Sequence, residues 1–366
     1  MWSEVRAEFP SLTHWTYLNT ATFGQLPVRA TQAVAEHFAH RDELACADFM
    51  SYFDDADRLR GKVGRLFNAA AQDIFFIPNA SQALSLLING IDWRPGDRIV
   101  TLSPEFPNHV YYPSLLAARG VELVEKPWPL YDVIDDRTRL VAISAMNYST
   151  GFRAPLVELG RFLRERGILF YVDGTQGAGV FDIDLREVDA DLFAVHGYKW
   201  MNAPNGAGCA AIAPRLREWL PPMVVGWRSD RGWREVNNLN HGAPILPEAA
   251  EKYEGAMLPF ALLYALEASV DMLLSMGMPR VEERALGLSE YLRDGLSKLG
   301  AGFADAGPSP IVAARWPHRE AADLALALKR ERILVSARHG HLRISTHFFN
   351  NEQDVDLCLN HLAQLL

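Results

Sequence analysis

Lys199 lies in an unusual setting for a lysine, the stretch VHGYKWMNAPNGAG at residues 195–208, most of whose members are aromatic, apolar or small. Burying a lysine ammonium without a partner costs several kcal/mol or forces the group to lose its proton. A sheltered, neutral lysine is a nucleophile that can form a Schiff base with an aldehyde. The stretch therefore indicates that Lys199 has a chemical role.

Two other segments place distinctive residues directly after a short apolar run. The turn NASQ at residues 79–82 follows DIFFIP and opens a helical pattern, so its free N–H groups and positive dipole end suit an anion such as phosphate. The same turn could simply cap the helix. Phe106 follows DRIVTL and is held rigidly between Pro104 and Pro107, although a loop aromatic can also cap a core.

A carboxylate and an amide follow a third apolar run. Asp173 comes directly after GILFYV, and Gln176 lies one turn further on in DGTQGAG. Asp173 could cap the next helix, but the surrounding glycines allow another group to approach the backbone closely.

The elements that must position these residues alternate between strands and helices. Residues 73–213 contain seven compact apolar runs typical of strands buried on both faces, separated by helical patterns that end in glycine. This order predicts an α/β fold with a mostly parallel sheet and helices on both faces. One or two long helices are expected over residues 249–278. From residue 282 the order helix, strand, helix, strand, strand, helix predicts a smaller α/β domain.

The candidate residues meet at one edge of such a sheet, because ligands of open α/β sheets bind beyond the carboxyl ends of the strands. A phosphate-binding turn, a rigid aromatic ring, a carboxylate and a lysine are together what pyridoxal 5'-phosphate requires. The lysine binds the aldehyde, and the carboxylate keeps the pyridine nitrogen protonated so that the ring accepts electrons from the substrate's Cα.

Composition and charge exclude several other classes of function. The net charge of −9 and the pI near 5.7 disfavour nucleic acid or an anionic membrane as a partner. The three cysteines lie far apart without CxxC spacing, which fits a reducing cytoplasm and no structural zinc site. We find neither a signal-peptide pattern nor an apolar run of membrane-spanning length. A nucleotide-binding dehydrogenase is disfavoured because no strand run is followed by GxGxxG.

The sequence resembles the class V aminotransferases, a family of fold-type I pyridoxal-phosphate enzymes that includes cysteine desulfurases, kynureninases and isopenicillin N epimerase-like proteins. The resemblance covers most of the chain and rests on YLNTATFGQLP, NASQALS, PEFPNHVYY, VDGTQGAGVFDIDLREVDADLFAVHGYKWMNAPNGAG and LRISTHFFNNEQDVD. It implies a homodimer with the active site near the subunit interface. It also implies a large cofactor-binding domain at residues 17–255 and a small domain made of residues 1–16 and 256–366.

The resemblance also implies roles for individual residues toward the cofactor. Lys199 would carry it as a Schiff base and move the substrate proton, while Asp173 would pair with the pyridine nitrogen. The remaining cofactor-binding residues implied are Gln176 at the phenolic oxygen, Phe106 stacked on the ring, Ala80, Ser81, His196 and Tyr198 at the phosphate, and Asn147 near the cofactor.

Arg343 in LRIS matches the arginine that usually clamps the substrate carboxylate in this family, and a bidentate guanidinium suits that task. An ordinary arginine at a strand edge is the alternative. The nearby His339, His341 and His347 do not predict a metal site, because a strand would alternate their faces and no supporting carboxylates are close in sequence.

Departures from the family narrow the expected chemistry to three options. Cysteine desulfurases carry a reactive cysteine on a loop before the carboxylate-binding arginine, and KRERILVSARHGHLRIS contains none, so desulfurase activity is disfavoured. Aminotransfer from an amino acid is the first expectation. Cβ cleavage or elimination, of the kynureninase or carbon–sulfur lyase kind, or epimerisation is the alternative, and a non-catalytic protein that only binds the cofactor is a third.

Overall fold

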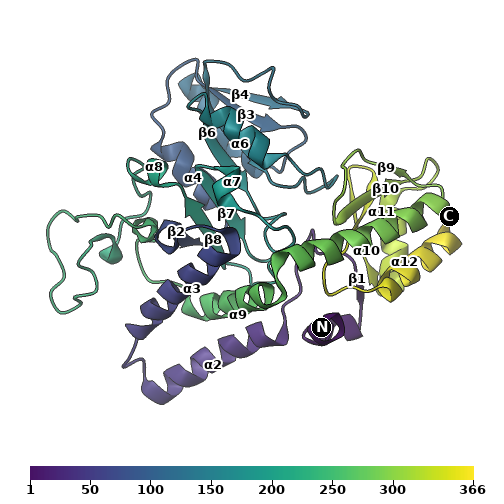
Figure 1. Ribbon diagram of the computed structural model, residues 1–366, viewed down its shortest axis with the longest axis horizontal. Coiled ribbons are helices and arrows are strands. Elements are labelled where there is room, and N and C mark those ends of the chain that lie inside the picture. The colour runs from purple at the N-terminus through teal and green to yellow at the C-terminus, as the bar shows by residue number, and fades with distance from the viewer.

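A seven-stranded sheet forms the centre of the large domain in the computed structural model, which describes residues 1–366 (Figure 1). The strand order is β2-β8-β7-β6-β5-β3-β4, and only β8 runs antiparallel to its neighbours. The mostly parallel sheet predicted from the sequence is thus confirmed. Its strands are β2 (Ile74–Ile77), β3 (Arg98–Leu102), β4 (Glu122–Lys126), β5 (Thr138–Ser144), β6 (Leu169–Asp173), β7 (Leu192–His196) and β8 (Gly208–Ile212).

Helices cover both faces of this sheet, because its strands are apolar on both sides. Along β6, Phe170 and Val172 join one buried cluster, whereas Tyr171 joins the other. The first cluster includes residues of α3 (Ser51–Phe67), α6 (Leu156–Arg164), α7 (Leu185–Val188) and α9 (Phe260–Met276), with α2 (Val28–Leu44) packed on α9. The second includes α4 (Ala80–Gly90) and α8 (Pro214–Arg217), with α5 (Asn108–Leu115) packed on α4.

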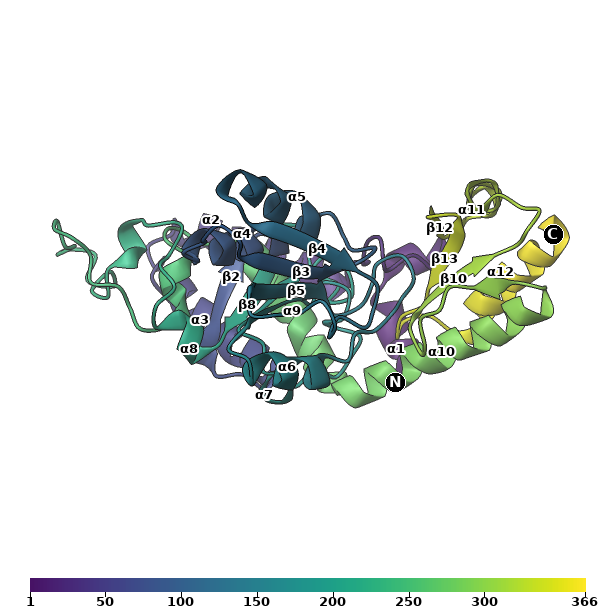
Figure 2. The same ribbon diagram turned by 90° about the horizontal axis from the view of Figure 1, so that it is seen from above.

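The small domain is a four-stranded antiparallel sheet with helices on one face. The order is β12-β13-β10-β9. Its strands are β9 (Gly302–Phe303), β10 (Ile311–Arg315), β12 (Ser336–Arg338) and β13 (His341–Ser345), and its helices are α10 (Met278–Lys298), α11 (Ala321–Arg330) and α12 (Glu352–Leu365). The helix α10 runs from the end of α9 along the small domain (Figures 1 and 2).

The N-terminal segment crosses to the small domain, where Figure 1 shows the N-terminus beside it. After α1 (Trp2–Ala7) and η1 (Pro10–Thr13), β1 (Thr16–Tyr17) pairs in parallel with β11 (Ile333–Leu334). Arg6 forms an ion pair with Asp354 of α12 at 2.7 Å. The predicted domain boundary at residue 255 falls before α9, which packs on α2 and α3 of the large domain.

The segment expected as one or two long helices over residues 249–278 is interrupted. A short 3-10 helix, η5 (Ala250–Tyr253), is followed by a break in which Gly255 has a φ of +70°, and α9 begins only after Pro259. Proline lacks the N–H that a helix interior needs, which sets the start of α9. Three short 3-10 helices complete the chain: η2 (Ala71–Asp73), η3 (Leu116–Arg119) and η4 (Trp227–Ser229).

No single helix is long and apolar enough to span a membrane. The pair α9 and α10 reaches that length and composition together, but the two helices are bent by 84° at their junction.

Candidate active site

A cavity of about 170 Å³ opens at the carboxyl ends of β2, β5, β6 and β7. Eight of the residues singled out from the sequence line it: Ala80, Ser81, Phe106, Asp173, Gln176, His196, Tyr198 and Lys199. Asn79, Asn108, Ser144, Tyr148 and Thr175 complete the lining. The topology thus gathers at one sheet edge residues that are up to 120 positions apart in the sequence.

Lys199 follows β7 and is buried, with 7% of its surface exposed. Burial lowers the pKa of Lys199 to about 8, with Asp173 opposing the shift and Arg343 adding to it. Its Nζ atom lies 5.5 Å from the centre of the Phe106 ring and 5.5 Å from that of Tyr198, and it forms no ion pair within the protein. An amine in this setting reaches its neutral, nucleophilic form near physiological pH.

Asp173 is the last residue of β6 and is buried at the floor of the cavity. Its Oδ1 atom accepts the N–H of Thr175 at 2.8 Å, which fixes the carboxylate and leaves Oδ2 available to a partner in the cavity. Thr175 in turn accepts the N–H of His196 through Oγ1 at 3.1 Å. The ends of β6 and β7 are therefore tied together.

The amide of Gln176 has a defined orientation, which its neighbour Trp200 sets. The Trp200 indole can only donate a hydrogen bond, and it donates to Oε1 of Gln176 at 2.7 Å. Nε2 must therefore be the donor end, and it donates one N–H to the carbonyl of Ala21 at 3.0 Å. The second N–H of Nε2 is left for an acceptor in the cavity.

The N-terminus of α4 forms the anion-binding part of the cavity. Asn79 caps the helix by accepting the N–H of Gln82, and the N–H groups of Ala80 and Ser81 have no acceptor within the helix. Nearby, Nε2 of His196 accepts the N–H of Gly206, so Nδ1 carries the proton. Burial lowers the pKa of His196 to about 4, so the ring is a neutral donor at physiological pH.

Glu105, which the sequence did not single out, holds the aromatic ring that covers the cavity. Its buried carboxylate accepts the N–H of Phe106 at 2.7 Å, and the N–H and hydroxyl of Ser144 at 2.8 and 2.7 Å. Three hydrogen bonds to one carboxylate fix the loop before α5 against the end of β5. The available signal for this role in the sequence was the position of Glu105 directly before Phe106, the residue predicted to stack on the ring.

Asn147 does not line the cavity. Its side chain organises the loop after β5, where Nδ2 donates to the carbonyl of Pro104 and Oδ1 accepts the N–H groups of Ser149 and Thr150. The next residue, Tyr148, reaches the cavity instead, because this turn directs its side chain there.

Tyr148 is joined to the small domain through His339, a contact that sequence reasoning missed. Tyr148 Oη and His339 Nε2 are 2.7 Å apart, and the Tyr148 ring stands edge-on to Phe106 with 5.3 Å between ring centres. Burial raises the pKa of Tyr148 above its ordinary value, so its hydroxyl is protonated at neutral pH. His339 is exposed at the turn between β12 and β13 and can exchange protons with water.

Arg343 does not line the cavity but lies buried beside it, with 1% of its surface exposed. It donates to Ser336 Oγ, to the carbonyl of Tyr148 and to the hydroxyl of Thr22. It forms no ion pair, and burial lowers the pKa of Arg343 to about 9, with Arg338 adding to the shift. A buried guanidinium held only by neutral acceptors fits the expectation of a carboxylate ligand.

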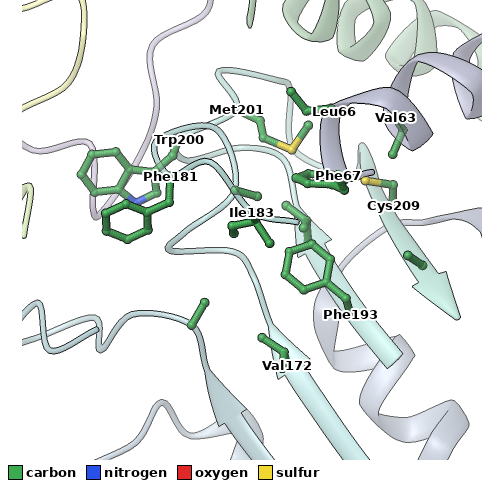
Figure 3. Packing of buried hydrophobic residues seen from close by; sticks show 14 of the residues in the cluster. Val63, Leu66, Phe67, Val172, Phe181, Ile183, Phe193, Trp200, Met201 and Cys209 are labelled. Carbon is green, nitrogen blue, oxygen red and sulfur yellow. The ribbon is translucent and has the colours of Figure 1, made fainter. Parts of the chain in front are cut away.

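The thiols are kept out of the cavity. Cys209 on β8 lies among apolar side chains of the core (Figure 3), and Cys358 lies in the core of the small domain. Burial raises the pKa of each of these two thiols to about 12. Cys46 follows α2 and accepts a hydrogen bond from Arg41.

His339, His341 and His347, the three histidines considered as metal ligands, do not lie together in one site. His347 is fully buried and donates from Nε2 to the carbonyl of Trp200 at 2.9 Å, whereas His341 contacts the carbonyl of His339 in its own turn. No group of three His, Cys, Asp or Glu side chains has the geometry to hold a metal ion.

The cavity fits pyridoxal phosphate group by group. The phosphate suits the free N–H groups at the start of α4, the basic ring nitrogen suits Asp173, the phenolic oxygen suits the free N–H of Gln176, and the aldehyde suits the amine of Lys199. When bound, the cofactor supplies an aldehyde that captures the substrate amine and a ring that accepts the electron pair released at Cα. The individual contacts remain predictions.

The fold and the site together define a pyridoxal-phosphate-dependent enzyme of fold type I. The chain belongs to the aminotransferase class-V family, whose model matches residues 16–357. The family, fold and cofactor expected from the sequence are thus confirmed.

Among curated proteins, the chain is 25% identical to a probable cysteine desulfurase of Methanothermobacter thermautotrophicus, over 97% of this chain and 95% of that protein. It is also 25% identical to an uncharacterized aminotransferase of Schizosaccharomyces pombe, over 83% of this chain and 80% of that one. Among solved structures, the cystine C–S lyase C-DES in complex with its product cysteine persulfide superposes with a TM-score of 0.88 at 23% identity, covering 97% of this chain and 99% of that one.

Proposed function

We propose that the protein is a lyase that releases a sulfur-containing group from Cβ of an amino acid. The observation that carries this proposal is the pair Tyr148–His339, a protonated hydroxyl on the cavity wall hydrogen-bonded to a solvent-exposed imidazole. A thiolate leaving group departs more easily when a positioned acid protonates it. The overall reaction would convert R–S–CH2–CH(NH3⁺)–COO⁻ and water into R–SH, pyruvate and ammonium.

Each residue of the site has one task in this proposal. Arg343 binds the α-carboxylate, and the neutral amine of Lys199 takes the proton from Cα. Tyr148 then gives its proton to the departing sulfur atom, and His339, which is open to water, restores it. Phe106, on the cavity wall, limits the access of bulk water to the reacting carbon.

The exclusion of thiols separates this proposal from cysteine desulfuration. A desulfurase must pass sulfur to a nearby thiol, whereas Cys209 and Cys358 are buried in apolar cores away from the cavity. The curated relative is named a probable cysteine desulfurase, but the structural neighbour C-DES is named a cystine C–S lyase. Those names support carbon–sulfur bond cleavage as the shared chemistry.

Aminotransfer, the first expectation from the sequence, stays a prediction. It moves one proton from Cα, a task for Lys199 alone, and it has no leaving group at Cβ. The Tyr148–His339 pair would then have no chemical task, which is why we rank elimination first.

Product analysis of the purified holoenzyme tests the proposal. S-methyl-L-cysteine, L-cystine and L-cysteine are each incubated with and without 2-oxoglutarate, and the products are identified by mass spectrometry. Elimination yields pyruvate and ammonium without an acceptor; aminotransfer needs the acceptor and keeps the side chain; desulfuration yields alanine. Alanine formation that is lost in Cys46→Ser would overturn the proposal in favour of a desulfurase.

We also propose that the enzyme is a homodimer. Met223, Val224, Val225 and Met257 are 45 to 59% exposed, and they belong to the segments around the projecting loop at residues 221–249 (Figure 2). Apolar side chains gathered in this way are typical of a protein interface. Light scattering on the eluting protein should give twice the monomer mass.

A further inference from the structure

The small-domain sheet has two unlike faces. Val312, Leu342 and Ile344 point to the helices and form the core of that domain. Cross-strand pairing places Ser336 opposite Arg343 and Arg338 opposite His341, and paired residues in antiparallel strands lie on the same face. Because side chains alternate along a strand, both arginines lie on the face that the helices leave free.

That face is turned toward the cavity. Arg343 donates across the domain boundary to the carbonyl of Tyr148 and the hydroxyl of Thr22. His339, which follows Arg338 directly, reaches the hydroxyl of Tyr148 on the cavity wall. Arg338 does not line the cavity, but it lies near enough for its charge to act toward a lower pKa on Tyr148 and on Lys199, which do line it.

The positive charge at this end of the cavity has no counter-charge in the protein. Arg343 has neutral acceptors only, and Arg338 donates only to the carbonyl of Ala337, its own neighbour. Neither arginine forms an ion pair, whereas Arg60 and Arg228, the chain's buried arginines besides Arg343, both pair with Glu254. The two guanidinium groups also act on one another and on Lys199, since both lower the pKa of that amine. Two cations kept close without an anion are what a ligand with two negative groups would relieve.

We propose that Arg338 binds a second anionic group of the substrate, carried on the sulfur substituent, while Arg343 binds the α-carboxylate. The inference rests on the proposed lyase function. It narrows the substrate class to cysteine thioethers whose leaving group bears a carboxylate or a comparable anion. A planar guanidinium suits such a group because it can donate two parallel hydrogen bonds.

Two isosteric substrates test the assignment. S-carboxymethyl-L-cysteine and S-carbamoylmethyl-L-cysteine differ only in a carboxylate against an amide, and thiol release from each is followed for the wild-type holoenzyme and Arg338→Gln. We expect the wild type to favour the carboxylate by about 10- to 100-fold in kcat/KM, as expected for one charge-assisted contact. Arg338→Gln should lose that preference and cleave the amide within about threefold of the wild type.

A binding measurement keeps the inference separate from the lyase proposal. Calorimetric titration of the holoenzyme with succinate and with succinamate compares a dianion with its matched monoanion. The wild type should bind succinate about tenfold more tightly than succinamate, and Arg338→Gln should bind the two equally. The control variant Arg330→Gln, at an exposed arginine of α11, should keep the wild-type preference.

The outcomes separate the two proposals. If neither thioether is cleaved but the succinate preference depends on Arg338, the anion subsite stands and the lyase function falls. If Arg338→Gln weakens both thioethers equally, Arg338 is the α-carboxylate clamp or a structural residue, and the inference is overturned. Equal affinity of the wild-type holoenzyme for succinate and succinamate would overturn the inference as well.

Discussion

Tyr148 and His339 meet across the boundary between the two domains, with Tyr148 Oη 2.7 Å from His339 Nε2. Neither domain alone contains the pair, so its proton chemistry exists only when the domains are packed as described. The contact comes with an uncommon backbone conformation, since His339 has a φ of +47° in the turn before Gly340. Histidine is one of the few residues that adopt this conformation at moderate cost.

Replacing Tyr148 with phenylalanine removes the proposed acid, and the resulting loss of rate should depend on which leaving group the substrate carries. Release of methanethiol from S-methyl-L-cysteine should slow by about 10²- to 10⁴-fold, the usual contribution of a general acid. Elimination from β-chloro-L-alanine should change little, because chloride leaves without a proton. Steady-state assays of pyruvate formation measure both.

Tyr111→Phe is the matched control, because Tyr111 is 70% exposed on α5 and does not line the cavity. Equal slowing of both substrates in Tyr148→Phe would show that Tyr148 only shapes the cavity.

The amine of Lys199 should react with pyridoxal phosphate at a lower pH than an ordinary lysine does. Because burial lowers the pKa of Lys199 to about 8, the neutral amine predominates above that pH. The rate of covalent attachment to the apoprotein should rise about tenfold per pH unit below 8 and level off above it. Stopped-flow absorbance follows the reaction, and Lys199→Ala should show no attachment. A rate that keeps rising to pH 10 would contradict the assignment.

Arg343→Lys should weaken the use of amino acids but not of simple amines. Losing a charge-assisted pair of bonds to the α-carboxylate costs about 1.5 to 3 kcal/mol, because lysine lacks the planar fork. We expect a higher KM for amino acids, measured in the assays above, and almost no change in the slow reaction of amines without a carboxylate. Unchanged kinetics with amino acids would indicate that Arg338, and not Arg343, binds the α-carboxylate.

Gly179 should tolerate alanine much less well than Gly96 does. Both glycines have a φ of +93°, but a Cβ at Gly179 would lie 2.4 Å from the Trp200 carbonyl oxygen, whereas one at Gly96 meets nothing. Gly96→Ala should lose about 1 to 2 kcal/mol from backbone strain alone. Gly179→Ala should lose clearly more in urea unfolding and should bind cofactor less well, because Trp200 follows Lys199. Equal losses would refute the argument.

Sequence patterns predicted the large domain well because its strands are buried on both faces and read as unbroken apolar runs. The strand ends then located Asp173 and Lys199 through a general rule of α/β sheets. The contacts of His339, Arg338 and Glu105 could not be predicted in the same way. They depend on how the two domains pack and on which way a turn directs a side chain, and neither leaves a periodic signal. The break before α9 was missed although Gly255 and Pro259 mark it in the sequence.

The pairing of the N-terminal segment with the small domain also sets the order of events during synthesis. Arg6 and Asp354 are 348 positions apart, and β1 pairs with β11. At about 5 to 20 residues per second, the ribosome needs roughly 15 to 70 s to supply these partners. The first strand must therefore wait unpaired, while the large domain folds behind it, until β11 has been synthesised.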